Sequence, residues 1–186
     1  MYEGMLNRRL LVGAFGLLAV PALAQGNSRW VLEASTVTYH MSHPLHQADG
    51  ISHAARGKEV CHARECDFLI AVPVKSFDSG DSNRDLHMLQ ATRGAQFPIV
   101  TVRTRLPEDA SGSANIHADL EVEFAGQTAH YAQVPFQLSL AGSEAQLSGT
   151  IPVTLSDFKI DPPTLLMIPI KNAIPVRVEM TWRREQ

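Results

Sequence analysis

The stretch ADLEVEF, residues 118–124, alternates apolar side chains with acidic ones from its third residue onward. In an extended strand, successive side chains point to opposite faces, so this alternation predicts one apolar face and one charged face. The face expected to be buried comprises Leu120, Val122 and Phe124, and the face expected to meet solvent comprises Glu121 and Glu123. The stretch therefore predicts a strand in a sheet that buries one face only.

The same period of two continues on both sides of this stretch, and turn residues interrupt it at short intervals. The other stretches expected to form strands are residues 37–41, 67–74, 97–106, 132–142, 145–160 and 167–182. About seven or eight short strands, each with one bulky apolar face, predict an all-β fold. We expect an antiparallel sheet that closes on itself as an eight-stranded barrel in a single domain.

Residues 82–91, SNRDLHMLQA, are the one stretch with a convincing helical pattern, and they predict a single short helix. Ser82 or Asn83 is expected to cap its N-terminus, because either side chain can accept a hydrogen bond from a free backbone amide. Asp85 falls in the first turn, where a negative charge interacts favourably with the helix dipole.

The composition is that of an ordinary globular protein, with 19% charged residues, 45% hydrophobic residues and a formal net charge of -3. Proteins that bind nucleic acids usually carry a clustered basic surface. We therefore expect no nucleic-acid partner.

The N-terminus carries the pattern of a secretory signal peptide. Two arginines precede an apolar run at residues 10–20, and an Ala-Leu-Ala triplet ends at Ala24. The run is shorter than the roughly 20 residues that span a bilayer, so a membrane anchor is the less favoured alternative. We predict a signal peptide at residues 1–24, a mature domain at residues 25–186 and a periplasmic location. The paired arginines leave both general and twin-arginine export open.

The chain has two cysteines, Cys61 and Cys66, which are separated by four residues. A hairpin loop at His62–Glu65 would place the cysteines opposite each other on paired strands, at a distance that a disulfide can bridge. We therefore predict a structural disulfide. Free thiols and a redox-active or metal-binding pair remain as alternatives, although the spacing is not that of a C-x-x-C motif.

The segment SFDSGDSNRDLHM, residues 76–88, concentrates polar side chains between two regions of strand. Such residues are typical of turns, and a neighbouring arginine and aspartate can tie a helix to nearby backbone groups. We favour a structural corner over contact with a ligand head group, and catalysis is the least favoured role because no nucleophile setting surrounds the segment. The residues of this motif are Ser76, Asp78, Arg84, Asp85 and His87.

Four histidines cluster near the first strand, at His40, His43, His46 and His53. A metal site needs several ligands that converge on one ion. Strand alternation places His40 outward and His43 inward, and His46 and His53 are expected in a loop or bend. We therefore predict no metal site, and we expect His43 to make a polar contact inside the barrel.

Several segments, taken together in their order, resemble the YceI-like family of polyisoprenoid-binding proteins over nearly the whole mature chain. The most distinctive is KSFDSGDSNRDLHM, with its Arg-Asp pair and downstream histidine. The cysteine hairpin is not part of the general pattern of this family. The segments that carry the resemblance are residues 35–43, 75–88, 96–104, 118–139 and 155–180.

The resemblance implies a lipocalin-like barrel whose apolar interior holds a polyprenyl chain, such as an isoprenoid quinone or a polyprenyl phosphate. It implies a carrier rather than an enzyme, with the lipid as its ligand and no separate cofactor. Transient contact with a membrane or a membrane protein is expected, and both a monomer and a homodimer remain open. By strand alternation, the candidate ligand-binding residues are Val37, Tyr39, Met41, His43, Phe68, Ile70, Val72, Leu120, Val122, Phe124, Phe136, Leu138 and Phe158.

Alternation alone does not distinguish a hollow barrel from one that its own side chains fill. A second hypothesis also remains, in which the protein is a redox or metal-dependent accessory protein that uses the cysteine pair or the histidines. A side-chain-filled interior would count against the carrier hypothesis.

Overall fold

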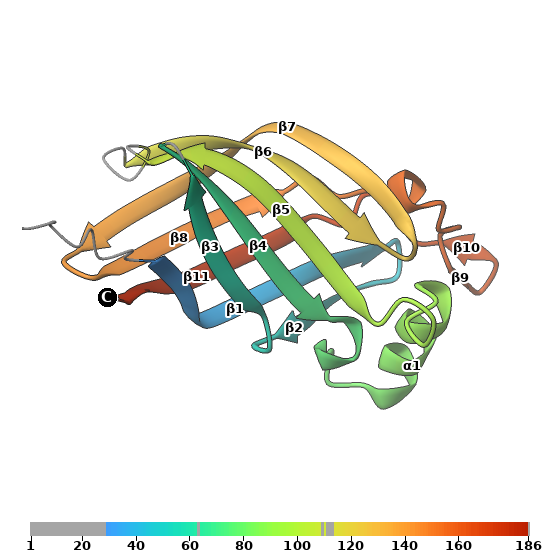
Figure 1. Cartoon of the computed structure of the whole chain (residues 1–186). Coiled ribbons are helices and arrows are strands. Elements are labelled where there is room, and N and C mark those ends of the chain that lie inside the picture. The colour runs from blue at the N-terminus through green and yellow to red at the C-terminus, as the bar shows by residue number, and fades with distance from the viewer. Residues whose placement is uncertain (1–28, 63, 109, 111–113, 186) are drawn as a thin grey trace, which may run out of the picture.

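The computed structural model describes residues 29–62, 64–108, 110 and 114–185, which form an antiparallel barrel with a short helix at one end (Figure 1). The predicted signal peptide, residues 1–24, lies outside the described residues. The strands are Arg29–His43 (β1), His46–Ser52 (β2), Arg56–His62 (β3), Glu65–Pro73 (β4), Ile99–Pro107 (β5), Asn115–Phe124 (β6), Gln127–Ala141 (β7), Glu144–Ile151 (β8), Thr164–Leu165 (β9), Ile168–Pro169 (β10) and Val176–Glu185 (β11). The helical segments are Val74–Ser76 (η1), Ser82–Ala91 (α1) and Leu155–Phe158 (η3).

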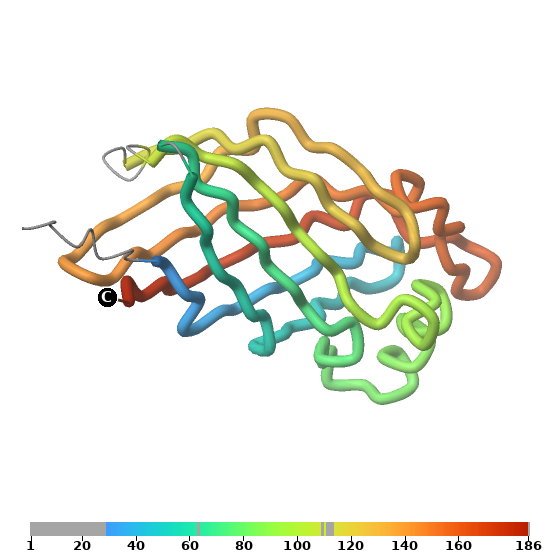
Figure 2. The backbone as a smooth tube through the Cα atoms, viewed as in Figure 1, coloured from blue at the N-terminus to red at the C-terminus, as the bar shows by residue number. Residues whose placement is uncertain are grey.

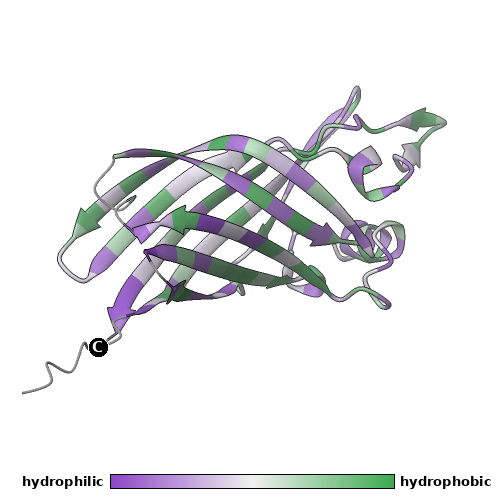
Figure 3. Cartoon of the chain, turned by 45° about the horizontal axis from the view of Figure 1, so that its top comes forward, coloured by the Kyte–Doolittle hydropathy of each residue, from purple (hydrophilic) through white to green (hydrophobic). Residues whose placement is uncertain are grey.

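The barrel closes because the first strand pairs with the last one. The strand order is β11-β8-β7-β6-β5-β4-β3-β1, and β1 returns to β11 through a register that runs from Arg29 opposite Glu185 to Tyr39 opposite Val176. This arrangement confirms the predicted all-β, eight-stranded antiparallel barrel. Figure 3 shows the alternation of hydrophilic and hydrophobic residues along the strands that the sequence pattern predicts.

Strands β2 and β3 act as two halves of one interrupted strand beside β1. Val37 of β1 lies opposite Ser52 of β2, and Val31 of β1 lies opposite Lys58 of β3. The second pair is thus six residues earlier in β1 and six residues later in the paired strands, as one continuous antiparallel register requires. β2 has few apolar residues, and for this reason the alternation pattern did not predict it as a strand. Contrary to the expected loop or bend, His46 is the first residue of this strand.

The polar segment at residues 76–80 bridges the open edge of β2. The backbones of Ile51 and Asp78 exchange two hydrogen bonds of 2.9 Å, and the hydroxyl oxygens of Ser52 and Ser76 lie 2.6 Å apart. The segment therefore fastens the chain that leads into α1 to the barrel wall, as expected of a structural corner.

The predicted helix forms over the predicted residues, but its N-cap is Asp81 rather than Ser82 or Asn83. The Asp81 carboxylate accepts hydrogen bonds from the backbone amides of Asn83 and Arg84, at 2.9 and 3.1 Å. Asp81 has the extended backbone of a cap residue, whereas Ser82 already belongs to the first helical turn. These two bonds lower the pKa of the Asp81 carboxyl.

The C-terminal third departs from the predicted strands at two places. Leu155–Phe158 forms the short helix η3, which Thr154 and Asp157 cap reciprocally, so the strand that begins at Glu144 ends at Ile151. Residues 164–169 form the small β9–β10 hairpin, and the last barrel strand begins only at Val176. Proline lacks the amide hydrogen that a ladder needs, and Pro169 and Pro175 bound the segment that stays outside the barrel.

The end of the barrel that carries α1 and the β9–β10 hairpin lies opposite the end that carries the C-terminus (Figure 2). Among the described residues, every helix is too short or too polar to cross a membrane.

Candidate ligand-binding cavity

The barrel encloses an elongated apolar cavity of about 570 Å³. This volume lies within the range of roughly 300 to 1,000 Å³ that small-molecule sites usually have. The wall carries residues from all eight barrel strands, from α1 and from the β9–β10 hairpin. The interior is thus hollow rather than filled by its own side chains.

Strand alternation locates the apolar wall correctly. The structure places twelve of the thirteen candidate ligand-binding residues on the cavity wall: Val37, Tyr39, Met41, Phe68, Ile70, Val72, Leu120, Val122, Phe124, Phe136, Leu138 and Phe158. Two of the aromatic pairs on this wall, Phe68 with Trp182 and Phe124 with Phe158, meet edge to face at centroid distances of 5.5 and 5.3 Å. Eleven of the twelve lie in strands that the sequence pattern predicts, and their inward faces follow directly from the period of two, whereas Phe158 lies in η3.

His43 is the exception, because it is buried but lies outside the cavity wall. Its Nε2 lies 3.2 Å from the carbonyl oxygen of Ile168, and its Nδ1 accepts a hydrogen bond from the amide of Leu45 at 3.2 Å. The imidazole therefore joins the β1–β2 turn to the β9–β10 hairpin. The neighbouring His46 lines the cavity instead, with its ring centroid 5.6 Å from that of His43.

The two remaining histidines of this region make local contacts. His40 Nδ1 lies 2.7 Å from a carboxylate oxygen of Asp49 on the paired strand. His53 Nδ1 lies 3.1 Å from the carbonyl oxygen of Ser35. Each of these two rings thus has a partner other than a histidine.

The motif at residues 76–88 combines a hydrogen-bonded corner with one side of the cavity wall. Asp85 accepts hydrogen bonds from the amide and the hydroxyl of Ser79, at 3.1 and 2.5 Å. Arg84 donates to the hydroxyl and to the carbonyl oxygen of the same serine, at 2.8 and 2.6 Å. Both Arg84 and His87 also line the cavity at the α1 end. The corner is therefore held together internally, and two of its side chains form part of the cavity wall.

The polar side chains on the wall include Glu59 and Thr104, which the sequence analysis missed. Glu59 is only 5% exposed, and its Oε2 accepts a hydrogen bond from the amide of Trp30 at 2.8 Å. Burial raises the pKa of the Glu59 carboxyl above its ordinary value. The signal was available in the sequence, because Glu59 lies two residues before Cys61 and so shares its face of the strand.

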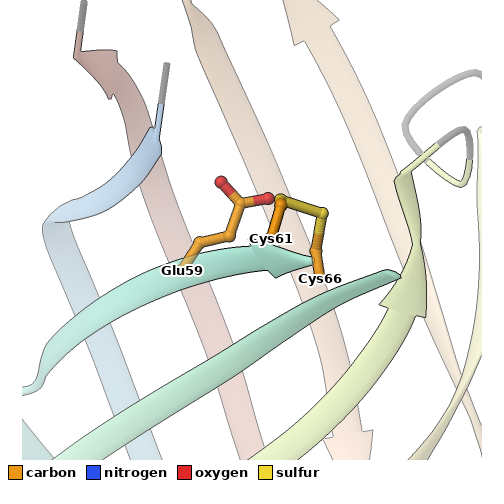
Figure 4. A group of neighbouring side chains, drawn as sticks. All are labelled: Glu59, Cys61 and Cys66. Carbon is orange, nitrogen blue, oxygen red and sulfur yellow. A yellow bond between two sulfur atoms is a disulfide. The ribbon is translucent and has the colours of Figure 1, made fainter. Parts of the chain in front are cut away.

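The predicted disulfide between Cys61 and Cys66 is present and joins directly opposite positions of β3 and β4. The loop is shorter than expected, since His62 and Glu65 pair with each other as part of the ladder. Figure 4 shows the Glu59 carboxylate beside the two sulfur atoms, and these ligand atoms lie within 4.8 Å of one another. After reduction, the three side chains would offer two thiolates and a carboxylate to a metal, but in the disulfide the sulfurs are bonded to each other.

Comparison with known proteins agrees with this geometry. A model of the YceI-like domain matches residues 30–182. A polyisoprenoid-binding domain from Saccharophagus degradans has a similar structure, with a TM-score of 0.71 and 14% identity over 84% of this chain and 98% of that one. BcnA of Burkholderia cenocepacia is similar with a TM-score of 0.66 and 14% identity, over 79% of this chain and 95% of that one. No curated protein matches the sequence.

A closed antiparallel barrel around an apolar cavity defines a barrel-type binding protein. Because the family model covers most of the chain, the protein belongs to the YceI-like family. The resemblance found in the sequence segments is thereby confirmed.

Proposed function

We propose that this protein is a periplasmic carrier that holds a long-chain isoprenoid lipid, such as a polyprenyl compound or an isoprenoid quinone, inside its barrel. The observation that carries the proposal is the elongated apolar cavity, whose wall consists mostly of aliphatic and aromatic side chains. The polyisoprenoid-binding domain with a similar fold supports the same ligand class.

The physical basis of such binding is burial of the chain. Each CH₂ group that moves from water to an apolar environment contributes roughly 0.8 kcal/mol. A prenyl chain with many such groups gains enough free energy to stay bound without a dense set of polar contacts. We therefore propose a binding protein rather than an enzyme, with the lipid as its only ligand.

The tip of the β9–β10 hairpin supports transient contact with a membrane as part of this function. Leu166 is 75% exposed and Met167 is 96% exposed, and both have positive φ angles, of 51° and 66°. Large apolar residues are unfavourable in such an exposed turn, where asparagine and glycine are usual. The adjacent Leu165 lines the cavity, so the apolar tip is continuous with the ligand site.

Native mass spectrometry of the mature protein purified from its own cells tests the carrier function. We expect a bound mass that extracts into organic solvent as a prenyl lipid. The delipidated protein should take up an added isoprenoid quinone or prenyl alcohol and regain a bound mass. A protein that carries no prenyl lipid and takes none up would contradict the proposal.

A further inference from the structure

Glu59 is an ionisable group in a cavity that is otherwise mostly apolar, and it sits near the end of the barrel that carries the disulfide. The amide of Trp30 gives it one hydrogen bond, the charge of Arg184 stabilises its ionised form, and the charge of Glu108 opposes that form. Burying a carboxyl group in apolar surroundings is costly unless its oxygens have partners. The burial of Glu59 on the cavity wall therefore suggests a function for this carboxyl group other than packing.

Thr104 lies at the same level of the barrel. Glu59 of β3 pairs with Phe68 of β4, and Phe68 pairs with Thr104 of β5, so the three side chains form one inward-facing row. Neighbouring strands lie about 4.8 Å apart, which places the backbones of Glu59 and Thr104 roughly 10 Å from each other. Within the part of the chain that the structure describes, the buried hydroxyl oxygen of Thr104 has no hydrogen-bond partner.

The aromatic ring of Phe68 lies between these two polar groups. The ring is held in place by an edge-to-face contact with Trp182, at a centroid distance of 5.5 Å. The row thus presents a flat apolar surface, with a carboxyl group on one side and a hydroxyl group on the other. A flat group that stacks on Phe68 could place its polar substituents toward both.

We infer that Glu59 and Thr104 form a polar subsite inside the cavity, which binds an uncharged hydrogen-bonding group of the ligand, such as a carbonyl or a hydroxyl. This inference rests on the proposed carrier function and narrows its ligand class. An ionised Glu59 accepts a hydrogen bond from a hydroxyl, and a protonated one donates to a carbonyl. An anionic phosphate would meet repulsion from the carboxylate. A bare hydrocarbon would leave the Thr104 hydroxyl unpaired and would add no partner to the Glu59 carboxyl group, which already accepts a hydrogen bond from the Trp30 amide.

The test compares three probes that share one carbon skeleton or nearly so: geranylgeraniol, geranylgeranyl monophosphate and the hydrocarbon phytane. Trp30 and Trp182 are the two tryptophans of the chain, and both line the cavity, so a change in their fluorescence emission reports binding to the delipidated protein. We expect the alcohol to bind about tenfold more tightly than phytane, as the loss of one hydrogen bond to a buried group predicts, and also more tightly than the phosphate, which the carboxylate repels.

Variants of Glu59 and Thr104 test whether these two residues cause the preference for the alcohol. Thr104→Val keeps the shape of the side chain, and Glu59→Leu removes the carboxyl group. Each should weaken binding of the alcohol about tenfold and should not weaken binding of phytane, which makes no hydrogen bond to either residue. Glu59→Gln keeps the hydrogen bonding without the charge, so it should retain the alcohol and bind the phosphate better. Thr101→Val, on the outward face of the same strand, is the matched control and should change nothing.

The outcomes separate the subsite from the carrier function. If wild-type protein binds all three probes equally and Thr104→Val and Glu59→Leu leave that pattern unchanged, the subsite is refuted while the carrier function stands. If none of the probes binds, the carrier function fails and the subsite with it. Should Glu59→Leu fail to fold, Thr104→Val and Glu59→Gln still decide the question, because both preserve side-chain volume.

Discussion

At the scale of single residues, Glu59 makes the stability of the protein depend on pH in a direction that can be stated in advance. Its pKa is raised in the folded protein, chiefly because burial disfavours the charged form. Below the ordinary glutamate value of about 4.3, the carboxyl group is protonated in both states and burial carries no charge penalty. As the pH rises toward the raised folded value, the unfolded state ionises first, so the free energy of unfolding falls.

The variant Glu59→Gln should therefore be as stable as the wild type in acid and more stable at neutral pH. The glutamine oxygen can still accept the hydrogen bond from the Trp30 amide, so the charge is the main difference. Urea denaturation of both proteins over a series of pH values measures the difference in their free energies of unfolding. Glu123→Gln, on the outer face of β6, serves as the control. If the difference in the free energy of unfolding between Glu59→Gln and the wild type stays constant with pH, then ionisation of Glu59 does not destabilise the folded protein.

Some residues of the cavity wall can be predicted from the period of two in the sequence. Others can be located only once the fold is known. Phe68 and Val122 were predicted because an inward position in a strand follows from counting by two. The position of His43 outside the wall depends on where the chain at Ile168 returns, some 125 residues later, and no local pattern contains that information. Thr104 has the inward parity of β5, but its unpaired hydroxyl becomes evident only when the neighbouring strands are in place.

At the scale of elements, the disulfide-linked hairpin of β3 and β4 is expected to contribute to stability rather than to binding. A cross-link over a short loop stabilises mainly by restricting the unfolded chain, by about 2 kcal/mol. We expect the double variant Cys61→Ala and Cys66→Ala to lose about that amount in urea denaturation. The same variant should bind the prenyl probes as the wild type does. As a control, wild-type protein treated with a thiol reductant should lose the same free energy of unfolding. A variant that is stable but no longer binds the probes would instead favour a functional role for the cysteine pair.

A variant of the β9–β10 turn can test membrane contact without disturbing the fold. Leu165 pairs with Ile168, so Leu166 and Met167 form a two-residue turn whose positive φ angles suit Asn-Gly. The double variant Leu166→Asn and Met167→Gly should keep or raise the thermal stability, yet lose most of its association with phospholipid vesicles. Sedimentation with vesicles measures that association.

Val60 provides the matched control for this experiment. It is 45% exposed on the outer side of β3, away from the hairpin, so Val60→Thr should leave vesicle association unchanged. Equal sedimentation of the Asn-Gly variant and the wild type would refute the role of the hairpin tip in membrane contact.

Strands and helices could be predicted from the sequence where the alternation of apolar and polar residues is strong. They were missed where other interactions determine the local structure. The central strands and α1 follow from hydrophobic periodicity and helix signals. Strand β2 is polar, and it forms because its backbone completes the ladder beside β1 rather than because of its side chains. The 3₁₀ turn at Leu155–Phe158 forms through the reciprocal bonds of Thr154 and Asp157, a capping pattern that interrupts an otherwise strand-like run.

At the scale of the whole molecule, the hollow interior predicts that a bulky residue can be added without loss of the fold. Val102 is half-buried and lines the cavity from the centre of β5. Val102→Trp should fill part of the space, abolish uptake of a long prenyl chain and leave thermal stability close to that of the wild type. Thr101→Trp, one residue away and facing outward, is the control. Native mass spectrometry reports the bound ligand, and full uptake by Val102→Trp would show that the lipid binds elsewhere.

The closure of the barrel by β1 and β11 also has a consequence for how the chain matures. The two strands that complete the wall lie at opposite ends of the described sequence, with Arg29 opposite Glu185. A growing chain cannot seal the barrel until its last strand has emerged, and folds dominated by such distant contacts form slowly. The unfinished chain thus exposes the apolar inner faces of its strands until β11 pairs with β1.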